Sequence, residues 1–237
     1  MSRIGFVFTR KMPLAYLSHL DMVRLFLRAL RRSRLPLAFS RGFNPHPRLT
    51  LALPLPVGVT ASEEYGEMYF TEPTRTEEFL ARLRAQLPEA VELNNAFIVP
   101  PETPSLASLV GAALYRAVLK NISAPGLTVE SVRNALERML AKKEILVCRR
   151  TKKKKKVLTD VRPYIIDALV KKETGKPLEL NLVLRAGSRG GVTPFILLEL
   201  LESDPALEGI SSCDWHLHRE RIYTDDQGSL QPLSEGM

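Results

Sequence analysis

The chain has 237 residues, enough for two domains of about 100 to 120 residues that each bury a core. Its net charge of +8 and its pI near 9.6 favour partners that carry phosphate or an acidic surface. The two cysteines, Cys148 and Cys213, cannot build a disulfide framework and are expected to be ordinary strand residues in a reducing compartment. Apolar runs are too short to cross a bilayer and the N-terminal residues lack the pattern of a signal peptide, so we expect a soluble, cytoplasmic protein.

In the first half of the chain, the spacing of apolar residues predicts the element order βαββαβ. The strands are expected at residues 4–9, 49–59, 65–70 and 91–99, and the helices at 20–34 and 76–87. This order with short connections favours a ferredoxin-like sandwich, in which two helices cover one face of an antiparallel sheet and the other face stays free.

The second half repeats the pattern, with strands expected at residues 114–122, 144–149, 178–185 and 213–223 and helices at 129–141 and 193–202. Residues 152–173 are expected to be an insertion, in which residues 161–172 are partly helical. The sequence therefore predicts an α+β protein of tandem ferredoxin-like (βαββαβ) domains with antiparallel sheets.

Composition suggests the domain boundaries. The segment around Pro101 and Pro104 has little periodicity, which predicts a linker at residues 101–112. The N-terminal domain then covers residues 1–100 and the C-terminal domain residues 113–224. From Asp225 on the residues are polar and include Gly, Ser and Pro, so residues 225–237 are expected to be a flexible tail.

The first predicted helix carries four arginines on one arc, at Arg24, Arg28, Arg31 and Arg32. Its apolar face is expected at Leu20, Val23, Phe26, Leu27 and Leu30. Ser18 and Asp21 suit a capping box at its start. The arc is either a solvated basic face or a phosphate-binding surface. Because no acidic partner stands at i+4, we interpret it as a binding surface.

The loop after this helix is a second candidate binding element. Gly42, Pro45 and Pro47 constrain its backbone, so its polar side chains should project. Phe43 could stack on a base or anchor in the core. The candidate RNA-binding residues of this loop are Arg41, Phe43, Asn44, His46 and Arg48.

Two segments of the second half add candidate anion contacts. The densest charge run is expected to be an exposed, mobile hairpin that contacts phosphates, through Arg149, Arg150, Lys152, Lys153, Lys154, Lys155 and Lys156. A Gly-rich segment before the last helix is either a flexible, hairpin-like connection or an anion site at the helix start. Its residues are Gly187, Ser188, Arg189, Gly190 and Gly191.

Several motifs together resemble one known family. They are Ser18-His19-Leu20-Asp21, Arg28-Ala29-Leu30-Arg31-Arg32, the run from Ser40 to Pro47, and Pro56-Val57-Gly58. This combination resembles the radical-SAM-linked family, a domain of unknown function, and Asp160 to Ile165 and Thr193-Pro194 look like its later motifs. Members are typically fused to, or encoded beside, a radical SAM protein with a cobalamin-type domain. The resemblance implies a radical SAM partner and an RNA or ribosomal setting.

The chain itself is expected to be a non-catalytic partner. A radical SAM enzyme needs three closely spaced cysteines for its cluster, which two distant cysteines cannot supply. No zinc spacing, dinucleotide fingerprint or hydrolase motif is present, so we expect no cofactor and no metal. An imidazole pair can cleave RNA as general base and acid, and His19 and His46 keep that catalytic alternative open.

The sequence thus predicts an accessory RNA-binding protein that acts with a separate radical SAM enzyme, in RNA or ribosome modification or processing. One alternative is a metal-independent endoribonuclease that uses His19 and His46. The other is a protein-interaction module that never touches RNA. The expected partners are a radical SAM protein and RNA or a ribosomal component, and no membrane.

Overall fold

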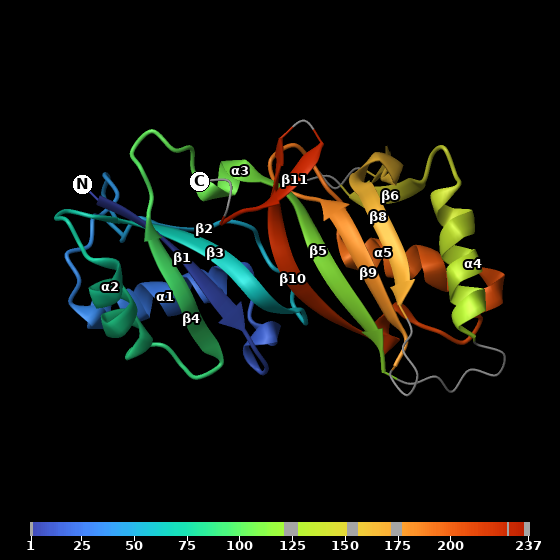
Figure 1. Ribbon diagram of the computed structural model, residues 1–237, viewed down its shortest axis with the longest axis horizontal. Coiled ribbons are helices and arrows are strands. Elements are labelled where there is room, and N and C mark those ends of the chain that lie inside the picture. Colours follow the sequence, from blue (N-terminus) through green and yellow to red (C-terminus); the bar gives the residue numbers. More distant parts are fainter. Residues whose placement is uncertain (1, 121–127, 151–155, 172–176, 227, 235–237) are drawn as a thin grey trace. The chain divides into compact units, whose positions relative to one another are not determined.

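The computed structural model describes residues 2–120, 128–150, 156–171, 177–226 and 228–234. The chain divides into two compact units (Figure 1). Unit 1 consists of residues 1–111 and 219–237, and unit 2 of residues 112–218. The division falls at the end of the segment that the sequence predicted as a linker, but the C-terminal residues return to unit 1.

Unit 1 has the predicted βαββαβ order. Its elements are β1 (Ser2–Arg10), α1 (His19–Ser33), β2 (Leu49–Leu51), β3 (Thr60–Phe70), α2 (Thr76–Arg84) and β4 (Val91–Ile98). The strand order is β4-β1-β3, with β2 paired to β3, and all of these pairs are antiparallel. Later in the chain, α3 (Leu106–Leu109), most of β10 (Trp215–Asp226) and β11 (Ser229–Pro232) complete the unit.

The core of unit 1 lies between the sheet and both long helices. Alternate residues of β1 point toward the helices, and Phe6 and Phe8 meet Phe26 of α1 with ring centroids 5.5 and 4.9 Å apart. Phe79 of α2 lies 5.7 Å from Phe6. Gly66 of β3 makes room for Phe6, since an added Cβ would lie 2.3 Å from its ring. One sheet face is therefore covered by α1 and α2, as predicted.

The opposite face of this sheet is not free as expected. Arg3 and Glu67 lie on it as a buried ion pair, and the Arg3 guanidinium also donates to the carbonyls of Thr103 and Pro104 at 2.7 and 2.8 Å. Leu106 is fully buried and donates its amide to Glu67. Buried charges need such partners, and the segment predicted as a linker supplies them.

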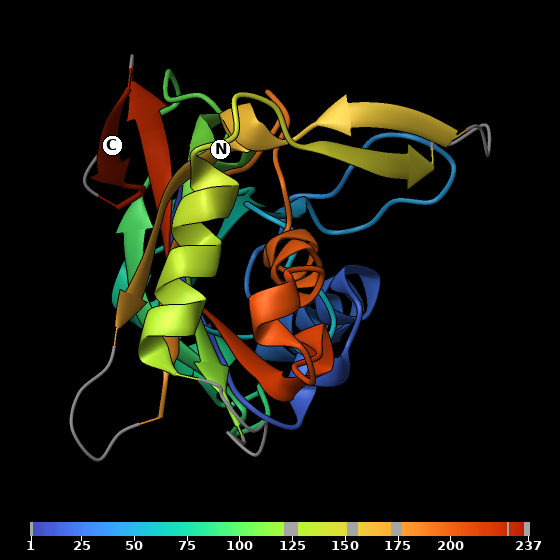
Figure 2. The same cartoon turned by 90° about the vertical axis from the view of Figure 1, so that its right-hand side faces the viewer.

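The described part of unit 2 combines an antiparallel sheet, two α-helices and a separate hairpin. Its elements are β5 (Val110–Leu119), α4 (Val129–Leu140), β6 (Leu146–Arg150), β7 (Lys156–Asp160), β8 (Ile165–Lys171), β9 (Glu179–Arg185) and α5 (Pro194–Glu202), followed by the first residues of β10. The order β5-β9-β8 is antiparallel, and β6 pairs with β7 alone. Figure 2 shows the β6–β7 hairpin (yellow) extending away from α4.

Two predicted elements differ in the structure for local reasons. The predicted strand at 49–59 ends at Leu51, because Pro54 and Pro56 lack the amide hydrogens that a ladder needs and Gly58 turns with φ +87°. Of residues 161–172, which were expected to be partly helical, only Arg162–Tyr164 form a short 3-10 helix. Strand β8 follows at Ile165–Lys171, which agrees with the strand preference of its β-branched residues.

Parts of the predicted linker and of the predicted tail form regular structure. Residues 106–112 of the predicted linker form α3 and the start of β5. The predicted tail contains β11, whose Ser229 and Pro232 pair with Asp226 and Tyr223 of β10. The predicted tail is thus ordered in part by a local hairpin, in which β11 pairs with the end of β10. In the described ranges, no helix has the length and apolar character needed to cross a membrane.

Candidate nucleic-acid interface

Helix α1 begins at a side-chain cap. Ser18 is the N-cap residue, and its Oγ accepts a hydrogen bond from the Asp21 amide at 3.2 Å. The hydroxyl of Ser18 also donates to the Asp21 carboxylate at 2.6 Å. This hydrogen bond, together with the neighbouring Arg24, holds the pKa of Asp21 below its ordinary value. The motif at 18–21 therefore has a local structural role.

The buried face of α1 is formed by Met22, Phe26, Ala29 and Leu30. Leu20, which the helical wheel placed on the apolar face, is 63% exposed, and Val23 is only partly buried. The four arginines of the predicted arc are exposed: Arg24, Arg28, Arg31 and Arg32. Because the buried residues occupy the other face of α1, the four arginines face solvent along most of the helix.

Three of these arginines line one groove. It has a volume of about 400 Å³ and is lined by Leu17, Asp21, Arg24, Leu25, Arg28, Arg32 and Pro88. Residues four apart rise about 6 Å along a helix, so the three guanidinium groups start from evenly spaced positions. Arg31 does not line this groove. The groove combines a row of cations with an apolar floor.

The arginines are not equally available to a ligand. Arg24 pairs with Asp21 at 2.9 Å, an acidic partner at i−3 that the expectation about position i+4 did not cover. Arg32 donates to the side chain and the carbonyl of Gln86 at 3.1 and 2.7 Å. Within the part of the chain that the structure describes, the side chains of Arg28 and Arg31 have no hydrogen bond or ion pair.

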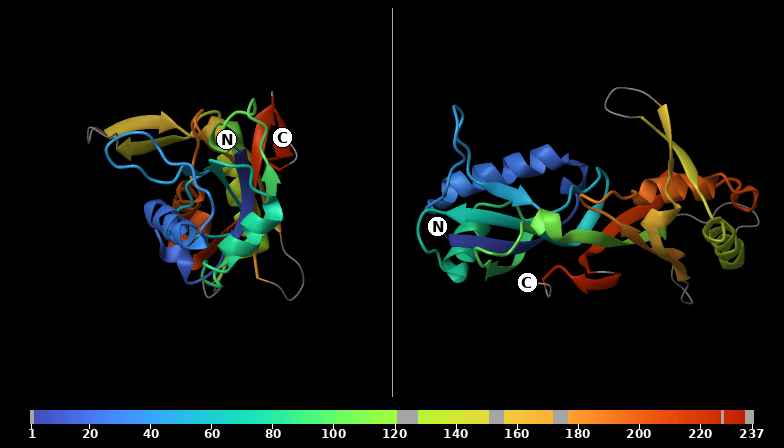
Figure 3. Two further views of the ribbon diagram at one scale, coloured as in Figure 1. Left: turned by 90° about the vertical axis from the view of Figure 1, so that its left-hand side faces the viewer. Right: turned by 90° about the horizontal axis from the view of Figure 1, so that it is seen from above.

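The loop at residues 40–48 projects from unit 1 as a narrow hairpin (Figure 3, right). Its base is closed by hydrogen bonds from the Ser40 amide to the His46 carbonyl (2.8 Å) and from the Arg48 amide to the Ala38 carbonyl (2.9 Å). The Ser40 hydroxyl lies 3.0 Å from Nδ1 of His46. Gly42 takes φ +126°, a conformation that favours glycine.

The tip of this loop presents an aromatic ring to solvent. Phe43 is fully exposed, and its neighbours Arg41 and Asn44 are exposed as well. Phe43 therefore does not anchor in the core, and its stacking on a base stays a prediction. The loop returns to the sheet at Arg48, whose guanidinium carbon lies 3.8 Å from the centroid of the Tyr69 ring.

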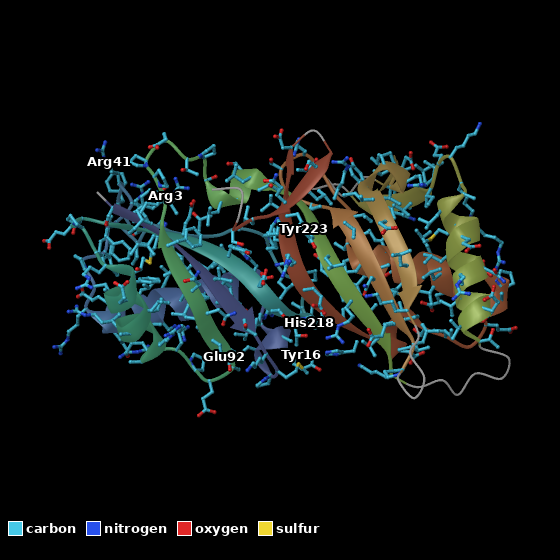
Figure 4. All side chains as sticks on the ribbon, viewed as in Figure 1. Arg3, Tyr16, Arg41, Glu92, His218 and Tyr223 are labelled. Carbon is cyan, nitrogen blue, oxygen red and sulfur yellow. The ribbon has the colours of Figure 1, made fainter. Side chains whose placement is uncertain are left out.

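The two candidate catalytic histidines are not brought together. His19 begins α1 near Arg10 and Glu64, at the C-terminal end of β1, whereas the loop of His46 meets Tyr69, which pairs with Arg3 at the other end. Figure 4 shows Arg41 and Arg3 toward one end of unit 1 and Tyr16 toward the other. The rise of a strand makes the separation roughly 20 Å. The general base and the general acid must both lie within hydrogen-bond reach of the same phosphodiester. Two histidines at opposite ends of unit 1 cannot do this.

The structure describes only part of the basic run of unit 2. Lys152, Lys153, Lys154 and Lys155 lie outside the described residues, whereas Lys156 is exposed at the start of β7. Arg149 and Arg150 belong to the backbone of β6. The expectation that this run contacts phosphates remains a prediction.

The glycines at 187–191 form a tight turn before α5. Gly187 and Gly190 have φ +96° and +99°, and the Gly190 amide donates to the Gly187 carbonyl at 3.3 Å. A Cβ on Gly191 would lie 2.4 Å from the Arg185 carbonyl oxygen. Close packing and turn geometry account for these glycines. The anion site involving Ser188 and Arg189 remains a prediction.

Sequence reasoning missed a buried ionic cluster in unit 1. Arg219 of β10 is fully buried, pairs with Glu64 of β3 and donates to the carbonyls of Leu53 and Pro54. Arg10 donates to three carbonyls of residues 14–17. Burial lowers the pKa of Arg10 and of His19, and the neighbouring Glu64 opposes this effect. The sequence signal that could have revealed this cluster is Arg219 itself, a charged residue at an inward-facing position of a strand.

The fold and the basic groove define an α+β protein with mostly antiparallel strands and an arginine-lined surface. The chain belongs to the family described as "Uncharacterized protein conserved in bacteria (DUF2344)", whose model matches residues 3–194. No curated protein matches the chain.

Two solved structures show weak likeness. A chain of the "Crystal Structure of a Cbf5-Nop10-Gar1 Complex" is similar at 12% identity and a TM-score of 0.46, over 94% of this chain and 51% of that one. This chain thus spans about half the length of that protein. An unknown protein from Galdieria sulphuraria is similar at 12% identity and a TM-score of 0.25, over 87% of this chain and 88% of that one.

Proposed function

We propose that this chain is a cytoplasmic accessory protein that binds RNA and acts with a separate radical SAM enzyme in RNA or ribosome modification or processing. The observation that carries the RNA half is the groove of Arg24, Arg28 and Arg32 on α1. Guanidinium groups bind phosphates by charge and by forked hydrogen bonds. The exposed Phe43 supports the same proposal, because aromatic rings at protein surfaces stack on unpaired bases.

The radical SAM half of the proposal rests on the motif resemblance. The motifs around His19, Phe43 and Val57 resemble the radical-SAM-linked family, and the two cysteines cannot hold the cluster of such an enzyme. The catalytic chemistry therefore belongs to a partner in this proposal. Arg149, Arg150 and the lysines at 152–156 would add phosphate contacts from unit 2.

The proposal includes a fold assignment for each unit. In unit 1 the order β4-β1-β3 with β2 beside β3 is the arrangement expected of a ferredoxin-like sheet. In unit 2 the order β5-β9-β8 suits the same arrangement if the β6–β7 hairpin is an insertion. We infer a tandem of ferredoxin-like domains.

The proposal is tested by recovery of the tagged chain from its own cells at physiological salt. RNA and a radical SAM protein should be retained. Replacing the groove arginines together (Arg24→Gln, Arg28→Gln, Arg32→Gln) should release the RNA and keep the protein partner.

A matched control removes the same charge elsewhere. Arg75→Gln, Arg82→Gln and Arg133→Gln change exposed residues at α2 and α4, so RNA should be retained in this variant. Equal loss of RNA in both variants would show that only net charge matters. Retention of protein partners without RNA would favour the interaction module instead.

The endoribonuclease alternative has its own test. RNA incubated with the purified chain in EDTA should remain intact, because His19 and His46 lie toward opposite ends of unit 1. Cleavage that disappears in the double variant His19→Ala, His46→Ala would reverse this conclusion.

A further inference from the structure

A second cavity of unit 1 lies at the base of the loop that carries Phe43. Its volume is about 370 Å³, and it is lined by Ser2, Arg3, Arg48, Tyr69, Ile98, Val99 and Pro101. This volume is at the small end of the range for small-molecule sites, which suits one ring-bearing unit and not an extended ligand. We refer to it as the Tyr69 pocket.

Two guanidinium groups lie over the Tyr69 ring in this pocket. The guanidinium carbon of Arg48 is 3.8 Å from the ring centroid and that of Arg3 is 5.6 Å away. Arg3 is held by Glu67 and two carbonyls, so it is a fixed part of the wall. Arg48 lies over the ring, and its five N–H donors allow it to reach an incoming anion in addition to its existing contacts.

Apart from Ser2, the rest of the wall is apolar. Ile98 is 57% exposed although it ends a strand of the sheet, and Val99 and Pro101 continue the surface. In the described part of unit 1, β4 is the edge strand and Ile98 is its last residue. An apolar wall beside a cation fits a ligand that carries a flat ring and an anionic group.

We propose that the Tyr69 pocket binds one unstacked nucleotide of a single-stranded RNA. The phosphate contacts Arg48, and the base lies against Ile98 and Pro101. The inference rests on the proposed RNA binding and narrows its substrate to a single strand, because a paired base cannot leave its stack without a cost.

The position of the pocket supports this occupant. Arg48 is the last residue of the projecting loop, and its carbonyl accepts from the Tyr69 amide at 3.2 Å, so the loop is joined to the wall. A strand whose base stacks on Phe43 at the tip therefore has a route along the loop to the pocket at its base. Stacking at one point and capture of a base at another is a common way to bind single strands.

The test is NMR titration of the full chain with nucleoside monophosphates, with inorganic phosphate and uridine as part-ligands. We expect the Ile98 methyl signal to shift with the nucleotides at about 1 mM and much less with phosphate at the same concentration. Equal shifts with phosphate, or no shift with any nucleotide, would overturn the inference. Shifts of the same signals with an acidic peptide and not with nucleotides would also overturn it.

Variants separate the two halves of the site. Ile98→Ser should reduce nucleotide affinity by about tenfold and leave the weak phosphate response unchanged, whereas Arg48→Gln should reduce both. Leu169→Ser, at a similarly exposed position on β8, and Arg75→Gln are the matched controls and should bind like the wild type. Because Arg48 also supports the loop, Ile98→Ser and the wild-type titration decide the result if Arg48→Gln unfolds.

The outcome can be separated from that of the proposed function. Nucleotide binding without RNA retention would keep the pocket and remove the RNA-binding proposal. RNA retention that is unaffected by Ile98→Ser, with no nucleotide binding, would remove the pocket and keep the RNA-binding proposal.

Discussion

At the scale of single residues, burial separates arginines that hold the fold from arginines that can bind a ligand. Arg219 and Arg3 are buried and each pairs with a glutamate of β3. Arg28 is exposed and, within the described ranges, has no such partner. A buried charge must be compensated, whereas an exposed unpaired one is available to phosphate. The positive charge of the chain thus has two distinct uses.

Replacing Arg219 should strongly destabilise unit 1. Arg219→Met leaves Glu64 buried without its main partner, which costs about 3 to 5 kcal/mol, toward the lower end because Arg10 remains nearby. Urea unfolding measures the change. Arg221→Met, two residues along β10, removes an exposed pair with Glu63 and should cost only about 0 to 1 kcal/mol. Similar losses for both variants would contradict the structural role of Arg219.

Stability should fall in mild acid because of His19. Burial, with Arg219 and Arg10 nearby, lowers the pKa of His19 below its ordinary value of 6.5, although Glu64 opposes this. The unfolded chain therefore binds this proton more readily, and the free energy of unfolding decreases as the pH falls below about 6.5. Burial lowers the pKa of His216 as well, which adds a loss of the same sign.

Thermal unfolding measured between about pH 7.5 and pH 5 tests this expectation. His19→Gln should flatten part of the pH dependence, whereas His46→Gln, in the projecting loop, should keep it. A wild-type slope in the His19 variant would show that its burial does not control protonation.

At the scale of elements, α1 and the following loop carry the proposed recognition surface, and hydrogen bonds hold the start of the helix and the base of the loop. The Ser18 cap fixes the start of α1, and the hydrogen bonds between Ser40 and His46 fix the loop. Arginines on such elements lose less freedom on binding than lysines on a charged run. The two regions should therefore contribute differently to RNA binding.

Arginine and lysine variants should separate discrimination from bulk affinity. Arg28→Gln and Arg41→Gln should each cost about 1 to 3 kcal/mol and erode discrimination between RNAs. Replacing the lysines at 152–156 together should weaken the binding of all RNAs and reduce the salt slope by about 0.7 for each phosphate that is no longer neutralised. Filter binding at several salt concentrations measures both effects. The reverse pattern would move recognition to unit 2.

At the scale of the whole molecule, the last residues of the chain complete the first unit. Strand β11 pairs with β10, Leu233 is fully buried, and the hydroxyl of Tyr65 is hydrogen-bonded to Ser234. The C-terminus is therefore a structural part of unit 1. Truncation near residue 226 should expose the sheet face that these residues cover.

A single substitution tests this role of the C-terminus. Leu233→Ala should destabilise the protein by about 2 to 5 kcal/mol, because it empties a buried site. Leu230→Ala, at a partly exposed position in β11, should cost clearly less. Chemical denaturation measures both, and a negligible effect of Leu233→Ala would restore the expectation of a flexible tail.

The sequence by itself determined the elements whose apolar pattern is local. The helices α1, α2, α4 and α5 and the strands β1, β4 and β9 lie close to their predicted positions, because helical and strand periodicity depend on neighbouring residues alone. The exposure of the four arginines of α1 could be predicted in the same way, from their helical spacing. Of the proposed surface, Arg28 and Phe43 could be selected from type and spacing.

Only the tertiary structure decided which distant segments meet. The pairs Arg3–Glu67 and Arg219–Glu64 and the Tyr69 pocket each join residues that are far apart in the sequence. It also separated His19 from His46, which sequence reasoning had considered together. Such contacts depend on the packing of whole elements, and no local pattern of charge or hydrophobicity encodes them.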